Sequence, residues 1–314
     1  MRIESSEKVS SPSFLEEETR CGFLVTQRRK KLWQMQMELF QFVDSICKRY
    51  NIAYFAIGGT LLGAVRHQGF IPWDDDIDLA MFRPDYDRFV KYAMMEMKAP
   101  IFVQSPDSET DYALSHIKIR NSSSTGATRY DFEFNYNKGV FIDVFPIDSI
   151  PDNPEEKAQL KKGVLHYRKI LDVGARHFWY WQGDVKGSQE IVSAEEKKQL
   201  VAYVKEHSIP GICKDFDAFC SQYNQEDTTD CGILALELTS ERFFWKRSWF
   251  SKQILLPFEY LSMQCPGDFD AVLRKTYGDY TTFVRGGALH GSLLFEPEIP
   301  YTDYVLSDNA AGLI

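Results

Sequence analysis

The stretch GGTLLGAVRHQGFIPWDDDIDLAMF, residues 58–82 of a 314-residue chain, decides the expected fold. It ends with four carboxylates in five residues, Asp74, Asp75, Asp76 and Asp78. Apolar residues alternate with the last two, which predicts a strand from Asp76 to Met81. Because side chains alternate between the faces of a strand, Asp76 and Asp78 share one face while Ile77 and Leu79 share the buried one. For Asp74 and Asp75 we expect a solvated loop or a helix cap.

A third carboxylate, Asp143, interrupts the apolar run GVFIDVFP at residues 139–146. A lone aspartate in a buried strand is costly unless it is paired or bound to a metal. Two acidic strands side by side would place Asp76, Asp78 and Asp143 around one or two divalent ions. Mg²⁺, or Mn²⁺, prefers such oxygen ligands. The arrangement suits in-line phosphoryl transfer, which needs metal ions to neutralise phosphates and orient the nucleophile.

The paired glycines Gly58 and Gly59 follow a short apolar run at residues 53–57 that predicts a buried strand. Glycines let the backbone approach a ligand closely. Thr60 is expected to cap a short helix that ends at Val65. The backbone N–H groups at the start of this helix could hold a phosphate. We therefore expect Gly58, Gly59 and Thr60 to bind a diphosphate that faces the acidic strand.

Four basic residues are further candidates for binding the substrate. Arg66 and His67 are expected to follow the short helix, next to the phosphate site. The Arg66 guanidinium suits a phosphate, and a surface ion pair with a nearby aspartate is the alternative; His67 could instead only position the loop. Lys118 and Arg120 share one face of a predicted strand. They either hold the diphosphate or lie solvated on a half-exposed edge strand.

The rest of the chain predicts an α+β protein with a mixed sheet and packed helices. Residues 1–20 are polar and are expected to form a flexible N-terminal arm. Residues 21–150 contain the sheet, with helices over 32–50 and 84–97 and further strands at 101–103, 114–119 and 140–145. Residues 151–314 are expected to be mainly helical and to complete the acceptor side, with helices near 160–171, 195–206 and 216–223. Four consecutive aromatic residues at 178–181 suit helix packing, sugar stacking or a membrane interface.

Composition and absent motifs narrow the class of protein. The formal net charge is −9 and the pI is about 5.3, which disfavours a general nucleic-acid binder. None of the six cysteines forms a C-x-x-C pair, and no stretch is long and apolar enough to span a membrane. We expect a soluble cytoplasmic protein with reduced thiols. The basic run 28–31 could contact anionic lipid peripherally or form a solvated face. P-loop, Rossmann, H-E-x-x-H and G-x-S-x-G motifs are absent.

The stretch from Gly59 to Asp78 resembles the signature of the LicD family, which transfers phosphocholine from CDP-choline to sugars of bacterial surface glycans such as lipopolysaccharide or teichoic acid. That family is related to the fukutin-type ribitol-phosphate transferases and has the nucleotidyltransferase fold. Its core motif is Gly-Gly, then a strand with Asp-x-Asp, then a later strand with a third aspartate. The matching positions in this sequence are Gly58, Gly59, Thr60, Asp76, Asp78 and Asp143. Residues 256–259 (LPFE) and 277–280 (YGDY) resemble the family as well.

The resemblance implies a nucleotidyltransferase-like core and a metal-dependent phosphotransferase. This enzyme would move a phospho-alcohol, above all phosphocholine, from a CDP-linked donor to a glycan hydroxyl and release CMP. Asp76 and Asp78 would hold the metal, and Asp143 would complete the site and orient or deprotonate the acceptor hydroxyl. Two alternatives stay open. The chain could be a nucleotidyltransferase that releases pyrophosphate, or a catalytically inactive protein that binds nucleotide.

Overall fold

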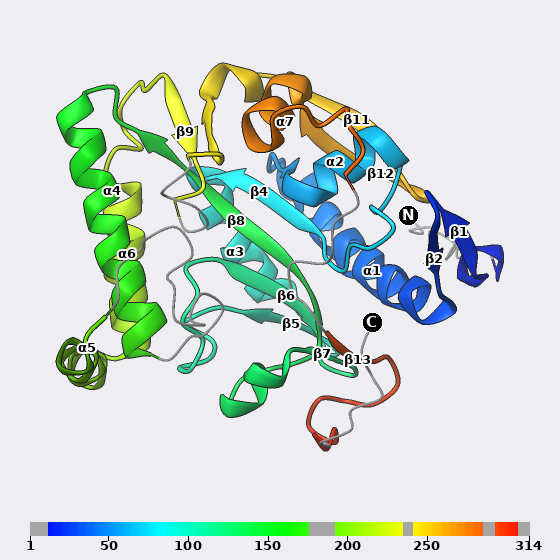
Figure 1. The fold of residues 1–314 in the computed structure, drawn as a ribbon, viewed down its shortest axis with the longest axis horizontal. Coiled ribbons are helices and arrows are strands. Elements are labelled where there is room, and N and C mark those ends of the chain that lie inside the picture. The colour runs from blue at the N-terminus through cyan, green and yellow to red at the C-terminus, as the bar shows by residue number, and fades with distance from the viewer. Residues whose placement is uncertain (1–11, 176–191, 235–240, 285–292, 307–314) are drawn as a thin grey trace.

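The computed structural model describes residues 12–175, 192–234, 241–284 and 293–306 (Figure 1). In these residues a seven-stranded mixed sheet is organised around one long strand, β8 (Val140–Ile150), which is buried at every position. One edge of β8 pairs in parallel with β4 (Asp78–Phe82). The other edge pairs antiparallel with β6 (Ile117–Asn121) and then with β9 (Asp230–Gly232). The outer strands are β3 (Phe55–Ala56), β5 (Ile101–Gln104) and β10 (Phe244–Lys246). The predicted α+β class is confirmed.

Two amphipathic helices pack against β8 and against each other. The first, α1 (Gln27–Tyr50), begins at the Thr26 cap and ends at Asn51, which adopts the left-handed conformation. It buries a stripe that includes Leu32, Leu39 and Val43. The second, α3 (Arg83–Glu96), carries Pro84 in its first turn, as predicted. Together with β3, β4 and the short helix α2 (Gly58–His67) they enclose the main hydrophobic core.

The start of α2 differs from the prediction that Thr60 caps it. The helix begins at Gly58, its N-cap residue is Ile57, and Thr60 lies inside the first turn. The Thr60 hydroxyl instead accepts a hydrogen bond from the backbone N–H of Asp78 at 2.8 Å. Regular pairing of β4 likewise begins at Asp78 rather than at Asp76. Thr60 therefore ties the helix to the first residue of the acidic strand.

The chain after residue 150 adds helices and also completes the sheet. A second hydrophobic cluster forms among α4 (Pro154–Lys169), the π-helical turn η3 (Ile170–Gly174), α5 (Ala194–His207) and α6 (Ile209–Ser221). Next come β9 and β10, the 3-10 turn η5 (Arg247–Phe250), the hairpin β11 (Gln253–Phe258) with β12 (Leu261–Pro266), and α7 (Phe269–Tyr277). The last strand, β13 (Leu294–Glu296), pairs with β7 (Thr125–Ala127) of the N-terminal half. In the chain, β7 is followed by a 3-10 turn, η2 (Arg129–Glu133), and then by β8. In the described part of this half, more residues lie in helices than in strands, and two of its strands, β9 and β10, extend the N-terminal sheet across the predicted boundary.

The N-terminal segment is also more structured than a loose arm. Within the described residues, a 3-10 turn, η1 (Pro12–Leu15), leads into the hairpin of β1 (Glu18–Arg20) and β2 (Phe23–Val25). Residues 1–11, and the aromatic run 178–181, lie outside the described residues. Among the described helices, none has both the length and the apolarity to cross a membrane.

The basic run 28–31 is engaged by groups of the protein itself. Arg29 and Lys30 are buried, and Lys30 pairs with Glu18 of β1. Arg28 pairs with Glu296, and Lys31 lies 3.8 Å from Glu298. Arg29 and Lys30 are therefore not part of a solvated face, while Arg28 and Lys31 are partly exposed beside their glutamates. Contact of this run with lipid stays a prediction.

Arg83 and Asp148 form a buried ion pair that joins α3 to the central strand. The guanidinium reaches both oxygens of Asp148 at 2.8 and 2.6 Å, and Asp148 is 1% exposed. Arg83→Met should therefore cost about 3–5 kcal/mol of unfolding free energy, because it leaves a buried carboxylate without its charged partner. Urea denaturation measures this loss. The control Arg88→Met removes a more exposed pair with Asp85 and should cost less than about 1 kcal/mol. Equal losses in both variants would contradict the assignment.

Candidate active site

Three neighbouring strands present a row of charged side chains at one level of the sheet. In the parallel pair, Asp78 of β4 lies directly opposite Asp143 of β8. In the antiparallel pair on the other edge of β8, Lys118 of β6 lies opposite the same Asp143. The backbone N–H of Asp143 also donates to the carbonyl of Ile77 at 2.9 Å. The two predicted acidic strands are thus adjacent, and a lysine completes the row.

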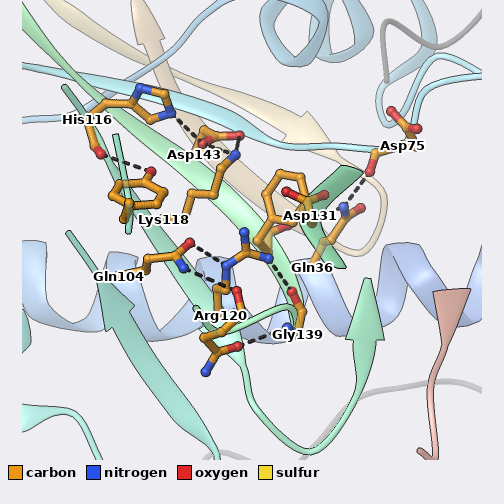
Figure 2. A network of polar contacts seen from close by, with 12 residues as sticks. Gln36, Asp75, Gln104, His116, Lys118, Arg120, Asp131, Gly139 and Asp143 are labelled. Atoms are coloured by element: carbon orange, nitrogen blue, oxygen red, sulfur yellow. Dashed lines mark hydrogen bonds and ion pairs between the residues drawn. The ribbon is translucent and has the colours of Figure 1, made fainter. Parts of the chain in front are cut away.

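The Asp143 carboxylate contacts two side chains, Lys118 of β6 and His116 just before that strand (Figure 2). The Lys118 ammonium donates to both carboxylate oxygens, at 2.6 and 2.8 Å. His116 Nε2 lies 2.9 Å from Oδ1. Burial acts to raise the pKa of Asp143, but the Lys118 charge and the His116 hydrogen bond outweigh it and lower the pKa. Burial lowers the pKa of His116, so its ring is neutral and Nε2 donates.

Asp78 experiences the opposite electrostatic environment. Burial raises its pKa well above the ordinary value, and the charges of Asp76, Asp143 and Asp74 raise it further. Lys118 counteracts only part of this effect. The negative charges of these three neighbouring carboxylates therefore all disfavour ionisation of Asp78.

The two glycines let these carboxylates approach the first turn of α2. A Cβ atom on Gly59 would lie 2.5 Å from Asp74 Oδ2, and one on Gly58 would lie 3.1 Å from Asp78 Oδ2. Gly58 also has a φ of 55°, a conformation that side chains other than glycine rarely adopt. The prediction that Gly58 and Gly59 face the acidic strand agrees with this geometry.

The acidic segment before β4 is less solvated than expected. Asp75 is only 2% exposed, so the expected solvated loop is wrong for this residue. One carboxylate oxygen from each of Asp74, Asp75 and Asp76 can be chosen so that all three lie within 4.8 Å of one another. Asp74 and Asp75 therefore lie close to Asp76, and the charge of Asp74 also acts on Asp78.

Helix α1 positions this segment through three side chains on one face. Arg29 and Trp33 donate to the carbonyl of Asp74 at 2.9 and 3.0 Å. Gln36 donates to the carbonyl of Asp75 at 2.6 Å (Figure 2). These residues follow one another at steps of four and three, which brings them to the same side of a helix. This spacing of Arg29, Trp33 and Gln36 could have indicated from the sequence that they share one side of the helix. The sequence analysis considered Arg29 only as part of the basic run 28–31.

The two C-terminal motifs meet the same region. Glu259, from LPFE, accepts hydrogen bonds from the backbone N–H of Phe70 at 3.1 Å and from Arg20 at 2.9 Å, which fixes the loop after α2. Tyr277, from YGDY, ends α7, and its hydroxyl lies 3.9 Å from the position of a Cβ on Gly58. Burial and the charges of Asp74 and Asp78 raise the pKa of Tyr277. Tyr277 is a site residue that the sequence analysis did not assign.

Arg66 and His67 lie elsewhere than predicted. Both are inside α2, at its C-terminal end, so Arg66 is separated from Gly58 by about 12 Å along the helix. Arg66 donates to the carbonyl of Tyr280 at 3.2 Å and stacks over Phe283. His67 Nδ1 lies 3.9 Å from the Cys21 sulfur. Their predicted position beside the start of the helix is wrong, because α2 is longer than the sequence suggested.

Lys118 and Arg120 share one face of β6, as strand alternation predicts. However, β6 lies between β5 and β8, so the edge-strand alternative is wrong. Both cations are buried and both lie over the Phe141 ring. Arg120 donates to Gln104 and to the carbonyl of Gly139 (Figure 2). Protein groups therefore occupy both cations that we expected to hold a diphosphate.

The donor set fits a hard divalent cation such as Mg²⁺ or Mn²⁺. Asp74, Asp76, Asp78 and Asp143 supply only oxygen atoms, which these ions prefer. Burial is the main cause of the raised pKa of Asp78, and the negative charges of its carboxylate neighbours add to it, so a divalent cation here would neutralise negative charge. The fit rests on the charge and chemistry of the side chains.

Comparison with known proteins agrees with this geometry. Residues 51–179 match the family model described as "LicD/FKTN/FKRP, nucleotidyltransferase domain". The chain carries a LicD-family domain. The match includes β3, α2, β4 and β8, and therefore the glycines and all four carboxylates.

Two relatives indicate the chemistry of the family. The lipopolysaccharide cholinephosphotransferase LicD of Haemophilus influenzae is 26% identical over 250 residues, which cover 78% of this chain and 88% of that protein. The human ribitol 5-phosphate transferase FKRP is 40% identical over 48 residues, which cover 15% of this chain and only 10% of that protein. Both relatives are named as transferases of a phospho-alcohol, and this chain is similar to them over the lengths given.

Replacing Asp78 by asparagine should leave the metal-free protein at least as stable as the parent. Folding raises the pKa of Asp78, so ionising it costs stability, and this cost grows as the pH rises through the raised pKa. Asp78→Asn removes the cost. Its melting temperature in chelator at neutral pH should equal or exceed that of the parent.

Replacing Asp143 by asparagine should instead lower the stability of the metal-free protein. Folding lowers the pKa of Asp143, so its ionised form contributes stability above its ordinary pKa, and that contribution disappears as the pH falls through the lowered pKa. Asp143→Asn leaves the Lys118 ammonium beside a neutral amide, which should cost about 3–5 kcal/mol at neutral pH. Denaturation of both variants in chelator compares them, and a similar loss in both would refute the electrostatic assignment.

Proposed function

We propose that this protein is a metal-dependent transferase that moves a phospho-alcohol, above all phosphocholine, from a CDP-linked donor to a hydroxyl of a cell-surface glycan or its precursor. One observation carries the proposal. Asp78 and Asp143 lie opposite each other on parallel strands, and Asp78 lies against the glycines at the start of α2. This geometry brings acidic oxygen ligands next to free backbone N–H groups, and phosphoryl transfer from a diphosphate needs both.

Asp76, Asp78 and Asp143 would hold the divalent cation, with Asp74 as a further carboxylate beside them. When bound, the ion supplies charge neutralisation at the phosphates and stabilises the leaving oxygen. The protein contributes a rigid arrangement of ligands. Thr60 fixes the backbone of Asp78, and α1 fixes the carbonyls of Asp74 and Asp75.

The start of α2 would bind the diphosphate of the donor. The N–H groups of its first turn and the positive end of the helix dipole favour a bound anion. The Thr60 hydroxyl accepts from the Asp78 N–H, so its own hydrogen can donate to a phosphate oxygen. Arg66 is not part of this proposal, since it lies at the other end of the helix.

The acceptor hydroxyl attacks the phosphorus that bears the alcohol. Its oxygen forms the new P–O bond, the bond to the CMP phosphate oxygen breaks, and CMP leaves while the hydroxyl proton is released. Of the two roles expected for Asp143, orienting the hydroxyl fits better. Its lowered pKa makes it a weak proton acceptor, because Lys118 and His116 already stabilise the ionised form.

The proposal predicts that chelation abolishes transfer and that Mg²⁺ or Mn²⁺ restores it. The assay combines CDP-choline with a glycan acceptor and measures CMP. Asp78→Asn should lower turnover by roughly 10³-fold or more, because it removes a ligand that stabilises the transition state. The matched control Asp215→Asn changes an exposed aspartate of α6 and should retain parental turnover. Full activity in chelator would refute the metal-dependent mechanism.

The products identify the reaction class. Release of CMP with phosphocholine on the acceptor supports the proposal, and a preference for CDP-ribitol would change only the alcohol. Release of pyrophosphate from a nucleoside triphosphate would show a nucleotidyltransferase instead. Binding of nucleotide without turnover across a panel of glycan acceptors would favour an inactive binding protein.

A further inference from the structure

Lys118 is a buried ammonium whose role the transferase mechanism does not assign. It lies on β6, opposite Asp143 in the sheet, and only 8% of the residue is exposed. We propose that Lys118 is an internal counter-cation for Asp143, which competes with the divalent metal for this carboxylate and keeps the metal-free protein folded. This inference rests on the proposed metal-dependent function and adds a residue that sets the affinity for the metal.

The geometry shows how completely Lys118 occupies Asp143. The ammonium contacts both carboxylate oxygens, at 2.6 and 2.8 Å, while His116 takes a second position on Oδ1. A carboxylate offers about four acceptor positions, and three hydrogen bonds fill most of them. A metal ion that binds Asp143 must therefore displace the ammonium or remain beside it.

The charges around the pair explain why the site needs a cation at all times. Asp78 lies opposite Asp143 on the far side from Lys118, and Asp76 and Asp74 add their charges to Asp78. Without metal, Lys118 neutralises one carboxylate of this group. With a divalent ion present, the ammonium and the ion repel each other, because both are positively charged and the same carboxylate brings them close together. The lysine thus stabilises the apo protein and weakens binding of the metal.

The face of β6 offers the ammonium a second environment along the strand. Its nitrogen lies 3.8 Å from the centroid of the Phe141 ring, where a cation is attracted to the aromatic face. The negative charge of Asp131 also favours the charged form of Lys118, whereas the positive charge of Arg120 disfavours it. A short movement toward Phe141 would release Asp143 without exposing the ammonium to water.

Arg120 provides a matched control on the same strand. It shares the face of Lys118, is also buried, and also lies over Phe141. Its hydrogen bonds go to Gln104 and the carbonyl of Gly139 rather than to a carboxylate of the site. Replacing Arg120 therefore removes a buried cation from the same layer without altering the partner of Asp143.

The experiment compares the parent with Lys118→Met, Lys118→Gln and Arg120→Met. Calorimetric titration with Mn²⁺ measures affinity, and thermal melting in chelator and in Mn²⁺ measures stability. Lys118→Gln keeps a hydrogen-bond donor near Asp143 and serves if Lys118→Met does not fold without metal. Both Lys118 variants should bind Mn²⁺ about tenfold more tightly than the parent or better. They should melt below the parent in chelator and recover most of the difference in Mn²⁺.

The outcomes separate this inference from the proposed function. Tighter binding in the Lys118 variants, with unchanged affinity in Arg120→Met, supports the counter-cation, even if the parent itself binds Mn²⁺ too weakly to measure. Parental or weaker affinity in the Lys118 variants, with a stability loss that Mn²⁺ does not reverse, overturns it and leaves the metal-dependent transferase intact. No Mn²⁺ binding in the parent or in any variant overturns both.

Discussion

The electrostatic cost of placing Asp78 and Asp143 side by side on buried strands governs the rest of this structure. Two carboxylates in such a position repel each other, and burial penalises each charge. The fold meets this cost asymmetrically. Lys118 and His116 stabilise the charge of Asp143, while Asp78 remains in an environment that opposes ionisation. We propose that a site built this way attracts a divalent cation, and its two central aspartates lie in different electrostatic environments.

Segments far apart in the sequence hold this arrangement in place. Helix α1 grips the carbonyls of the acidic segment, and Thr60 of α2 binds the backbone of Asp78. From the C-terminal half, Glu259 fixes the loop after α2 and Tyr277 approaches Gly58. The N-terminal hairpin reaches Glu259 through Arg20. The C-terminal half therefore contributes to the wall of the candidate site, and the similarity to LicD extends over 78% of the chain.

The sequence predicted the acidic strands well because an aspartate within an apolar run has few physical explanations. That argument located Asp78 and Asp143 without knowledge of the strand order. The errors arose where a local pattern had no information about its partners. Arg66 was expected just after a short helix and beside the phosphate site, but α2 begins at Gly58 and includes Arg66 in its last turn, far from that site. Thr60 was interpreted as a cap, because residue spacing gives no sign of its hydrogen bond with Asp78. Strands of three residues, such as β9 and β10, are too short to show alternation, so their return to the sheet was missed.

We propose that the carboxylates around Asp78 bind a divalent metal ion that faces the start of α2. Anomalous diffraction from crystals soaked with Mn²⁺ and CDP-choline tests this most directly. We expect an anomalous peak in bonding contact with carboxylate oxygens of both Asp76 and Asp78, with the diphosphate of the donor between that peak and Gly59. A peak at other residues, or a diphosphate bound away from the first turn of α2, would contradict it.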